Sequence, residues 1–303
     1  MAIHCVVCIK QVPDTKRITG EAMKEDGTVN RGALPAVFNP EDLNALETAL
    51  AIRDRLGGTV TVLTMGPPAA CEVLRTSLCL GADRGVLITD RRAAASDTLA
   101  TSYILACAVR KLSADVVLCG RQAIDGDTAQ VGPQLAEKLS VPLVTYVEEL
   151  IDVRATALRL RRNVGNGWEI VDCPVPALLT VMDAANTPRP PAARRIMAYK
   201  KARSPVELAG EVARALPDAD DADRAAEVDR RADALQQRGL LLDQWDLDDI
   251  EADLTWCGRD GSPTKVHRIQ AIVLAGGEYR QFEPTEDGVA QLVGELIEDH
   301  TIG

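Results

Sequence analysis

GRQAIDGDTAQVGP, which spans residues 120–133, is the stretch that decides the fold. It follows the apolar run 115–119, which predicts a buried strand, and it precedes residues 134–139, which predict a helix. A turn of small residues between a strand and a helix N-terminus presents backbone N–H groups and a positive dipole end, so it suits a phosphate group. Asp127 or Thr128 could cap that helix. An ordinary strand-to-helix loop is the alternative, because the stretch contains neither a Walker motif nor a GxGxxG motif.

Strand and helix patterns alternate over the first half of the chain. The strand patterns cover residues 3–9, 59–64, 85–89, 115–119 and 143–147, and the helix patterns cover about 39–55, 69–80, 96–112 and 134–139. This alternation predicts an α/β fold, with a parallel sheet that carries helices on both faces. Because ligands of such sheets bind beyond the carboxyl ends of the strands, we expect the loops at residues 8–12, 65–68 and 120–127 to share one crevice.

The pattern changes from about residue 150 onward. Residues 158–164 and 168–172 flank Gly165-Asn166-Gly167 and predict a β-hairpin, and residues 177–181 predict a further strand. Residues 211–238 are charged and rich in alanine, which predicts either a helix or a partly ordered linker.

These patterns predict three parts. Residues 1–203 form a nucleotide-binding α/β domain that includes a hairpin region at 155–182, and residues 204–240 form a charged insertion that is helical or partly ordered. Residues 241–303 form a C-terminal arm that ends in a helix at about 288–299 and packs on a partner subunit. Two of the three tryptophans lie in this arm, which favours a role in covering a partner. The alternative is that the arm folds back on its own domain.

Composition limits the classes of function. The net charge of −11 argues against nonspecific binding of nucleic acid. Apolar runs stay shorter than the roughly 18 to 20 residues that a membrane span requires, so we expect no membrane insertion. Because the first residues lead straight into a predicted strand, without a basic region or a cleavage site, we expect a cytoplasmic protein.

The eight cysteines do not form a metal-binding pattern. Cys5 and Cys8 make a CxxC, but residues three apart on a strand point to opposite faces of the sheet. No second CxxC or cluster of cysteine and histidine completes a metal site, so we expect no bound metal. The histidines His4, His267 and His300 are scattered, and no catalytic side chains are assigned.

Residues 122–133, QAIDGDTAQVGP, closely resemble the nucleotide-binding signature of the β subunit of electron transfer flavoproteins. The form DGDTAQVGP resembles the electron-bifurcating and nitrogen-fixation-type branch, whose β subunit holds a second FAD, whereas the ordinary branch holds AMP. Further stretches that resemble the family are 8–13, 39–47, 64–67, 80–84, 96–102 and 261–264. The resemblance is weak at about 204–240, and this region looks like a lineage-specific insertion.

The resemblance implies an adenine nucleotide hydrolase-like fold and a set of ligand contacts. By position, the cofactor-binding residues are Cys8, Asn39, Asp42, Met65, Gly66, Asp97, Thr98, Thr101, Asp125, Gly126, Asp127, Thr128, Ala129, Gln130, Val131, Gly132 and Pro133. Backbone N–H groups of residues 128–132 would hold the pyrophosphate. Asn39 and Asp42 have an alternative role as helix-capping residues only.

The resemblance also implies partners and chemistry. The chain would pair with an α subunit that carries its own FAD. NADH would give a hydride to the FAD of this chain, which would pass single electrons to a high-potential acceptor and to ferredoxin or flavodoxin. The chain would therefore oxidise NADH only within the αβ complex. The alternative is a non-bifurcating subunit that holds AMP and carries electrons from dehydrogenases to a quinone oxidoreductase.

One position departs from the family pattern. Many family members insert a leucine into a dehydrogenase partner from the loop after the last strand of the main domain. Ala193 takes that position here, so the partner is expected to differ from an ordinary acyl-CoA dehydrogenase.

Overall fold

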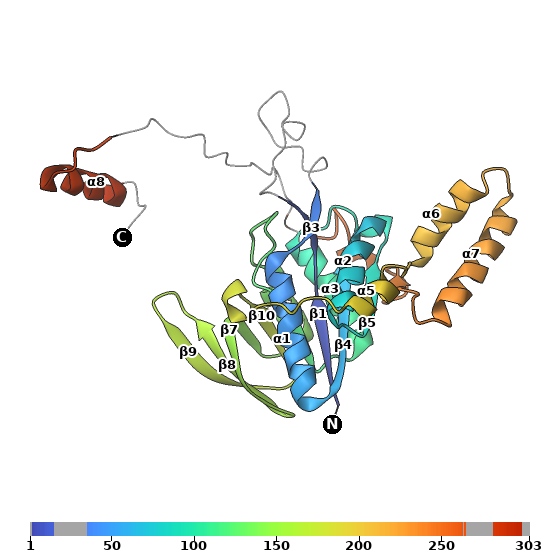
Figure 1. Ribbon diagram of the computed structural model, residues 1–303, viewed down its shortest axis with the longest axis horizontal. Coiled ribbons are helices and arrows are strands. Elements are labelled where there is room, and N and C mark those ends of the chain that lie inside the picture. The colour runs from blue at the N-terminus through green and yellow to red at the C-terminus, as the bar shows by residue number, and fades with distance from the viewer. Residues whose placement is uncertain (1, 15–34, 263, 265–280, 299–303) are drawn as a thin grey trace. The chain divides into compact units, whose positions relative to one another are not determined.

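A nine-stranded, mostly parallel sheet is the centre of this computed structural model, which describes residues 2–14, 35–262, 264 and 281–298. The strand order is β11-β5-β4-β1-β6-β10-β7-β8-β9, and only β7–β8 and β8–β9 pair antiparallel (Figure 1). The strands are β1 (Ile3–Cys8), β4 (Gly58–Met65), β5 (Arg84–Ile88), β6 (Val116–Gly120), β7 (Leu143–Arg154), β8 (Ala157–Asn163), β9 (Trp168–Pro174), β10 (Ala177–Val181) and β11 (Asp243–Trp245). A separate two-stranded ribbon joins β2 (Gln11–Pro13) to β3 (Ala36–Phe38).

Helices cover both faces of this sheet, as the alternating pattern predicts. These covering helices are α1 (Pro40–Leu56), α2 (Cys71–Leu80), α3 (Thr98–Leu112) and α4 (Val131–Leu139). The chain also forms α5 (Ala193–Tyr199), which packs on α2, and the pair α6 (Pro205–Ala215) and α7 (Asp221–Gln236), which projects away from the sheet (Figure 1). One buried core includes side chains of α1 and α2, such as Leu50 and Leu74, and the other includes side chains of α3 and α4, such as Ile104 and Leu135. The predicted α/β fold with helices on both faces is thereby confirmed.

The two cysteines of the CxxC contribute to different cores. Cys5 belongs to the core under α1, and Cys8 belongs to the core under α3 and α4. Their side chains therefore lie on opposite faces of β1, as the strand geometry predicts.

Several predicted boundaries shift. The strand expected at 143–147 continues to Arg154, because its second half pairs with β8 of the predicted hairpin. The helix expected from residue 134 begins at Val131, with Gln130 at the N-cap position and no side-chain capping bond. The prediction that Asp127 or Thr128 caps this helix is therefore wrong.

The segment at 204–240 forms a pair of helices, α6 and α7, rather than one helix or a linker (Figure 1). A capping box between Ser204 and Glu207 begins α6, whose Leu208 and Val212 are buried. The chain enters and leaves this helix pair at one place, because Leu242 N donates to Arg203 O at 2.8 Å.

The chain divides into two units, residues 1–267 and 268–303. The expected arm at 241–303 contributes β11 to the main sheet, and its final helix is α8 (Glu286–Glu298). Pro263, His267 and His300, which belong to the motifs and histidines named above, lie outside the described residues. Within the described part of the chain, no helix is long and apolar enough to cross a membrane.

Candidate functional site

The candidate site lies at the carboxyl ends of β1 and β6. From β1 the chain adds β4 and then β5 on one side, and it later crosses to β6 on the other side of β1. At this change of direction the loops that follow the two strands are neighbours, and this is the place where open α/β sheets bind ligands. The two loops touch, because Lys10 Nζ lies 2.7 Å from an Asp125 carboxylate oxygen.

Asn39 holds the loop after β6 with its side chain. It is fully buried at the start of α1, and its Nδ2 donates to Gln122 O at 2.9 Å. Its Oδ1 accepts from Ile124 N at 3.2 Å. Asn39 makes no side-chain capping bond to α1, so the alternative that it serves only as a helix cap is wrong.

Glu41 and Asp42, in the first turn of α1, also bind the chain around the end of β6. Glu41 is 7% exposed, accepts from Gln122 N at 2.9 Å and pairs with Arg121 at 2.9 Å. Asp42 is 5% exposed and accepts from Gly120 N at 2.9 Å and from Lys10 N at 2.8 Å. Its two carboxylate oxygens thus join the loops after β1 and β6 through their backbones.

Burial controls the ionisation of Asp42. It raises the pKa of this carboxyl to about 7, although the hydrogen bonds from Asn39, Gly120 and Lys10 favour the ionised form. Burial likewise raises the pKa of the neighbouring Cys8 thiol to about 12, with a further contribution from the charge of Asp42. Cys8 is therefore a thiol at neutral pH and not a nucleophile.

The loop after β6 presents backbone N–H groups. Gly126 N and Asp127 N donate to Ala123 O, and Asp127 Oδ1 accepts from Gln122 Nε2 at 3.1 Å. Asp127 and Ala129 have left-handed φ values of 47° and 52°. In the part of the chain that the structure describes, no hydrogen bond has its donor at the backbone N–H of residues 128–132. These N–H groups stand at the N-terminus of α4, where a bound anion would accept their hydrogen bonds.

Two glycines of the predicted motif have different surroundings. A Cβ on Gly126 would meet no atom within 4 Å, so the backbone there is open to a ligand. A Cβ on Gly132 would lie 2.7 Å from Thr180 Cγ2 and 3.0 Å from Cys119 Sγ. Gly132 therefore lets α4 pack closely against β6 and β10.

The N-terminus of α3 adjoins that of α4. Thr98 Oγ1 donates to Gln130 Oε1 at 2.8 Å. Asp97 caps α3 by accepting from Ala100 N at 2.9 Å, and Thr101 N donates to Asp97 O within the same turn. The structure thus places Thr98 against Gln130 of the loop, with Asp97 and Thr101 in the same turn of α3 as Thr98.

The remaining predicted residues occupy the same edge of the sheet. Met65 ends β4, which pairs with β1, and Gly66 N donates to Ile88 O at 3.0 Å. Residues that sequence reasoning missed are Lys10, Glu41, Arg121, Gln122, Ser262 and Thr264. The signal in the sequence that could have found Glu41 is the pair of consecutive acidic residues at positions 41 and 42.

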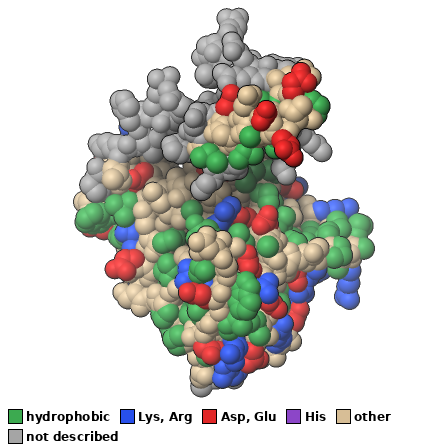
Figure 2. All heavy atoms as spheres, turned by 90° about the vertical axis from the view of Figure 1, so that its left-hand side faces the viewer, with side chains coloured by type: hydrophobic (Ala, Val, Ile, Leu, Met, Phe, Trp, Pro, Cys, Tyr) green, Lys and Arg blue, Asp and Glu red, His purple; other side chains and the backbone are tan. Residues whose placement is uncertain are grey.

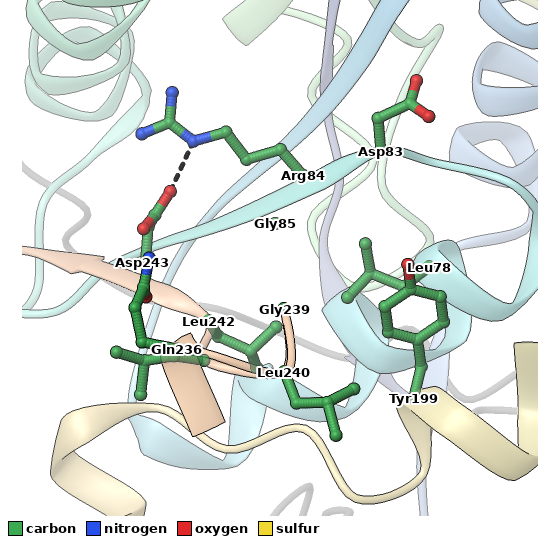
Figure 3. A pocket seen from close by; sticks show the side chains of 11 residues that line it. Leu78, Asp83, Arg84, Gly85, Tyr199, Gln236, Gly239, Leu240, Leu242 and Asp243 are labelled. Carbon is green, nitrogen blue, oxygen red and sulfur yellow. Dashed lines mark hydrogen bonds and ion pairs between the residues drawn. The ribbon is translucent and has the colours of Figure 1, made fainter. Parts of the chain in front are cut away.

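A separate cavity of about 290 Å³ lies elsewhere (Figure 3). It is lined by the first residues of β5 and β11 together with Tyr199, and the ion pair between Arg84 and Asp243 stands at its side. These residues are at the amino ends of their strands, whereas such sheets bind ligands at the carboxyl ends. The cavity is therefore not part of the candidate site.

Comparisons with known proteins agree on one family. Residues 26–207 match the family model described as electron transfer flavoprotein domain. The electron transfer flavoprotein subunit beta of Clostridium acetobutylicum is 38% identical over 301 residues, which cover 99% of this chain and 100% of that protein. Protein FixA of Bradyrhizobium diazoefficiens is 39% identical, with 97% and 91% covered. The caffeyl-CoA reductase-Etf complex subunit CarD of Acetobacterium woodii is 37% identical, with 99% and 100% covered.

Proposed function

Because this chain belongs to the electron transfer flavoprotein family, as a β subunit similar to FixA and CarD, we propose that it binds FAD and takes part in electron bifurcation. The loop after β6 would hold the FAD, which would supply acceptance of a hydride from NADH and transfer of single electrons to a high-potential acceptor and to ferredoxin or flavodoxin. The flavin supplies the redox chemistry, and the protein supplies binding, orientation and electrostatics.

The observation that carries the proposal is the row of N–H groups at residues 128–132, which have no acceptor among the described residues. They stand at the positive end of α4, so a pyrophosphate would accept their hydrogen bonds and gain from the helix dipole. The open backbone at Gly126 gives a ligand access to this loop. The side chains of Asn39, Glu41 and Asp42 already fix the backbone of this loop by hydrogen bonds. The loop therefore loses little conformational entropy when the nucleotide binds.

The side chains at the site bind rather than react. The Cys8 thiol is protonated at neutral pH, and the carboxylates of Glu41 and Asp42 are occupied by backbone N–H groups. The role of this chain in electron transfer is therefore to fix the position of the cofactor.

We further propose an electron transfer flavoprotein α subunit as partner. The hairpin strands expose Trp168 at 61% and Ile170 at 47%, and Figure 2 shows hydrophobic side chains between charged ones on the side of the molecule that carries these strands. In the separate C-terminal unit, α8 exposes Val289 at 56% and Ile297 at 53%. Exposed apolar side chains of this size favour burial against another chain. Ala193, at the start of α5, is exposed, and its short side chain favours a redox partner other than an acyl-CoA dehydrogenase.

The nucleotide content of the purified αβ complex tests the cofactor. After denaturing release and chromatography, the proposal expects two FAD and no AMP per heterodimer. One FAD and one AMP would replace it with the non-bifurcating function.

A charge reversal tests the loop. The Asp127→Lys variant is expected to lose the nucleotide of this chain, whereas Asp218→Lys, a matched reversal in the exposed turn between α6 and α7, is expected to keep it. Full nucleotide content in a folded Asp127→Lys complex would refute the assignment of the loop.

A further inference from the structure

Residues 257–262 and 264, together called the seated segment, lie against the loop between β5 and α3. Cys257 is 7% exposed and belongs to the core under α3 and α4. Gly258 has a φ of 69°, and a Cβ there would lie 2.3 Å from Arg92 O, so this close approach requires glycine. Gly258 N donates to Ser96 Oγ at 3.1 Å.

Asp97 fastens the end of the seated segment. One of its oxygens caps α3 through Ala100 N, and the other accepts from Ser262 Oγ at 2.8 Å and from Thr264 Oγ1. Ser262 is 5% exposed, so its hydroxyl is largely withdrawn from water. Burial alone would raise the pKa of Asp97, but the bonds from Ala100, Thr264 and Ser262 outweigh it and lower the pKa. Asp97 is therefore ionised at neutral pH and is a strong acceptor.

Thr98, the residue after Asp97, links these hydrogen bonds to the candidate site. Thr98 Oγ1 donates to Gln130 Oε1 at 2.8 Å, and Gln134 Nε2 donates to Thr98 Oγ1 at 3.4 Å. Gln130 is the residue at the N-cap position of α4, inside the row of N–H groups at 128–132. A continuous set of contacts thus runs from Ser262 and Thr264 to the loop that presents those groups.

We infer that nucleotide binding at the N-terminus of α4 and attachment of the seated segment are coupled through Asp97, Thr98 and Gln130. The inference rests on the proposed function, since it takes the loop at 128–132 as the nucleotide site. A pyrophosphate on that loop fixes Gln130, which fixes Thr98 and the start of α3, where Asp97 receives the seated segment. The coupling is reciprocal, so attachment of the segment favours the nucleotide by the same factor.

Hydrogen exchange of the full chain, with FAD and AMP as separate probes, measures one direction of this coupling. FAD is expected to slow backbone exchange in residues 257–264 of the wild-type chain. In the Thr98→Val variant saturated with FAD, that protection is expected to disappear.

Nucleotide affinity measures the reverse direction. The Ser262→Ala/Thr264→Val double variant removes both hydroxyls from Asp97 and is expected to raise the FAD dissociation constant about fivefold or more. Thr255→Val is the matched control, because Thr255 lies just before the seated segment and bonds to Asp253 rather than to Asp97. It is expected to bind FAD as the wild type does.

The outcomes separate this inference from the proposed function. FAD binding without protection of 257–264, or with equal affinity in the double variant, overturns the coupling and leaves the proposed function standing. Binding of AMP alone, with the same protection, supports the coupling and refutes the FAD assignment. Failure of the wild-type chain to bind either nucleotide overturns both.

Discussion

Replacing Asp42 with asparagine is expected to change how the free energy of unfolding depends on pH. Burial raises the pKa of Asp42 from 3.8 to about 7, so the folded chain holds a proton that the unfolded chain releases at lower pH. The resulting stability is complete below the unfolded pKa and is lost as the pH rises through the folded pKa. A difference of about three units corresponds to about 4 kcal/mol in total, of which about 2 kcal/mol is lost between about pH 5.5 and about pH 8.5.

Asparagine has no proton to lose in this range. The free energy of unfolding of Asp42→Asn, minus that of the wild type, is therefore expected to rise by about 2 kcal/mol from about pH 5.5 to about pH 8.5. Urea unfolding of the full chain, followed by tryptophan fluorescence at several pH values, measures this difference.

Asp54→Asn is the control on the same helix. The pKa of Asp54 is lowered, because its bonds to Arg53 and Arg189 outweigh the effect of burial, so it is ionised in both states across this range. Its difference from the wild type should stay constant with pH. An equally constant difference for Asp42→Asn would refute the reasoning, because it would mean that the buried carboxyl stays ionised throughout.

Three further predictions follow from the packing and the surface. Gly132→Ala is expected to lower the free energy of unfolding by about 1–3 kcal/mol, because its Cβ would press on Thr180, and unchanged urea unfolding would contradict this. Trp168→Glu is expected to keep the stability of the chain within about 0.5 kcal/mol but to weaken binding of the α subunit about tenfold or more in sedimentation experiments. Lys10→Ala is expected to cost less than about 1 kcal/mol of stability, because its pair with Asp125 is exposed, yet to weaken FAD binding measured by flavin fluorescence. If Lys10→Ala were unfolded, the expectation would be contradicted and Lys10 would have a structural role.

The order of strands and helices could be predicted because it depends on local patterns. The residues of α1, for instance, begin with Asn39 and Pro40 and end before Gly57, which are signals contained within the element itself. The hairpin of β8 and β9 was predictable from its turn for the same reason. The helix pair at 204–240 could not be predicted in the same way. In an alanine-rich, charged sequence a helix and an unfolded linker are close in free energy, and burial of residues such as Leu208 then favours the helix.

The chemistry of the candidate site depends on partners far along the chain. Asn39 contacts residues 83 and 85 positions away, and Asp97 contacts Ser262 at a separation of 165 positions. No local pattern encodes such bonds. The wrong capping assignment has a local origin instead, because Asp127 has a left-handed backbone and accepts a bond from Gln122, five positions away, rather than capping α4.

The neighbouring backbones of Arg203 and Leu242 make the helix pair α6–α7 an interchangeable module. Both ends of the pair leave the main sheet at one point, so an evolving chain could gain, lengthen or lose the module without changing the order of any strand. The same point offers a place to graft another domain while the nucleotide loops at the carboxyl ends of the strands stay intact.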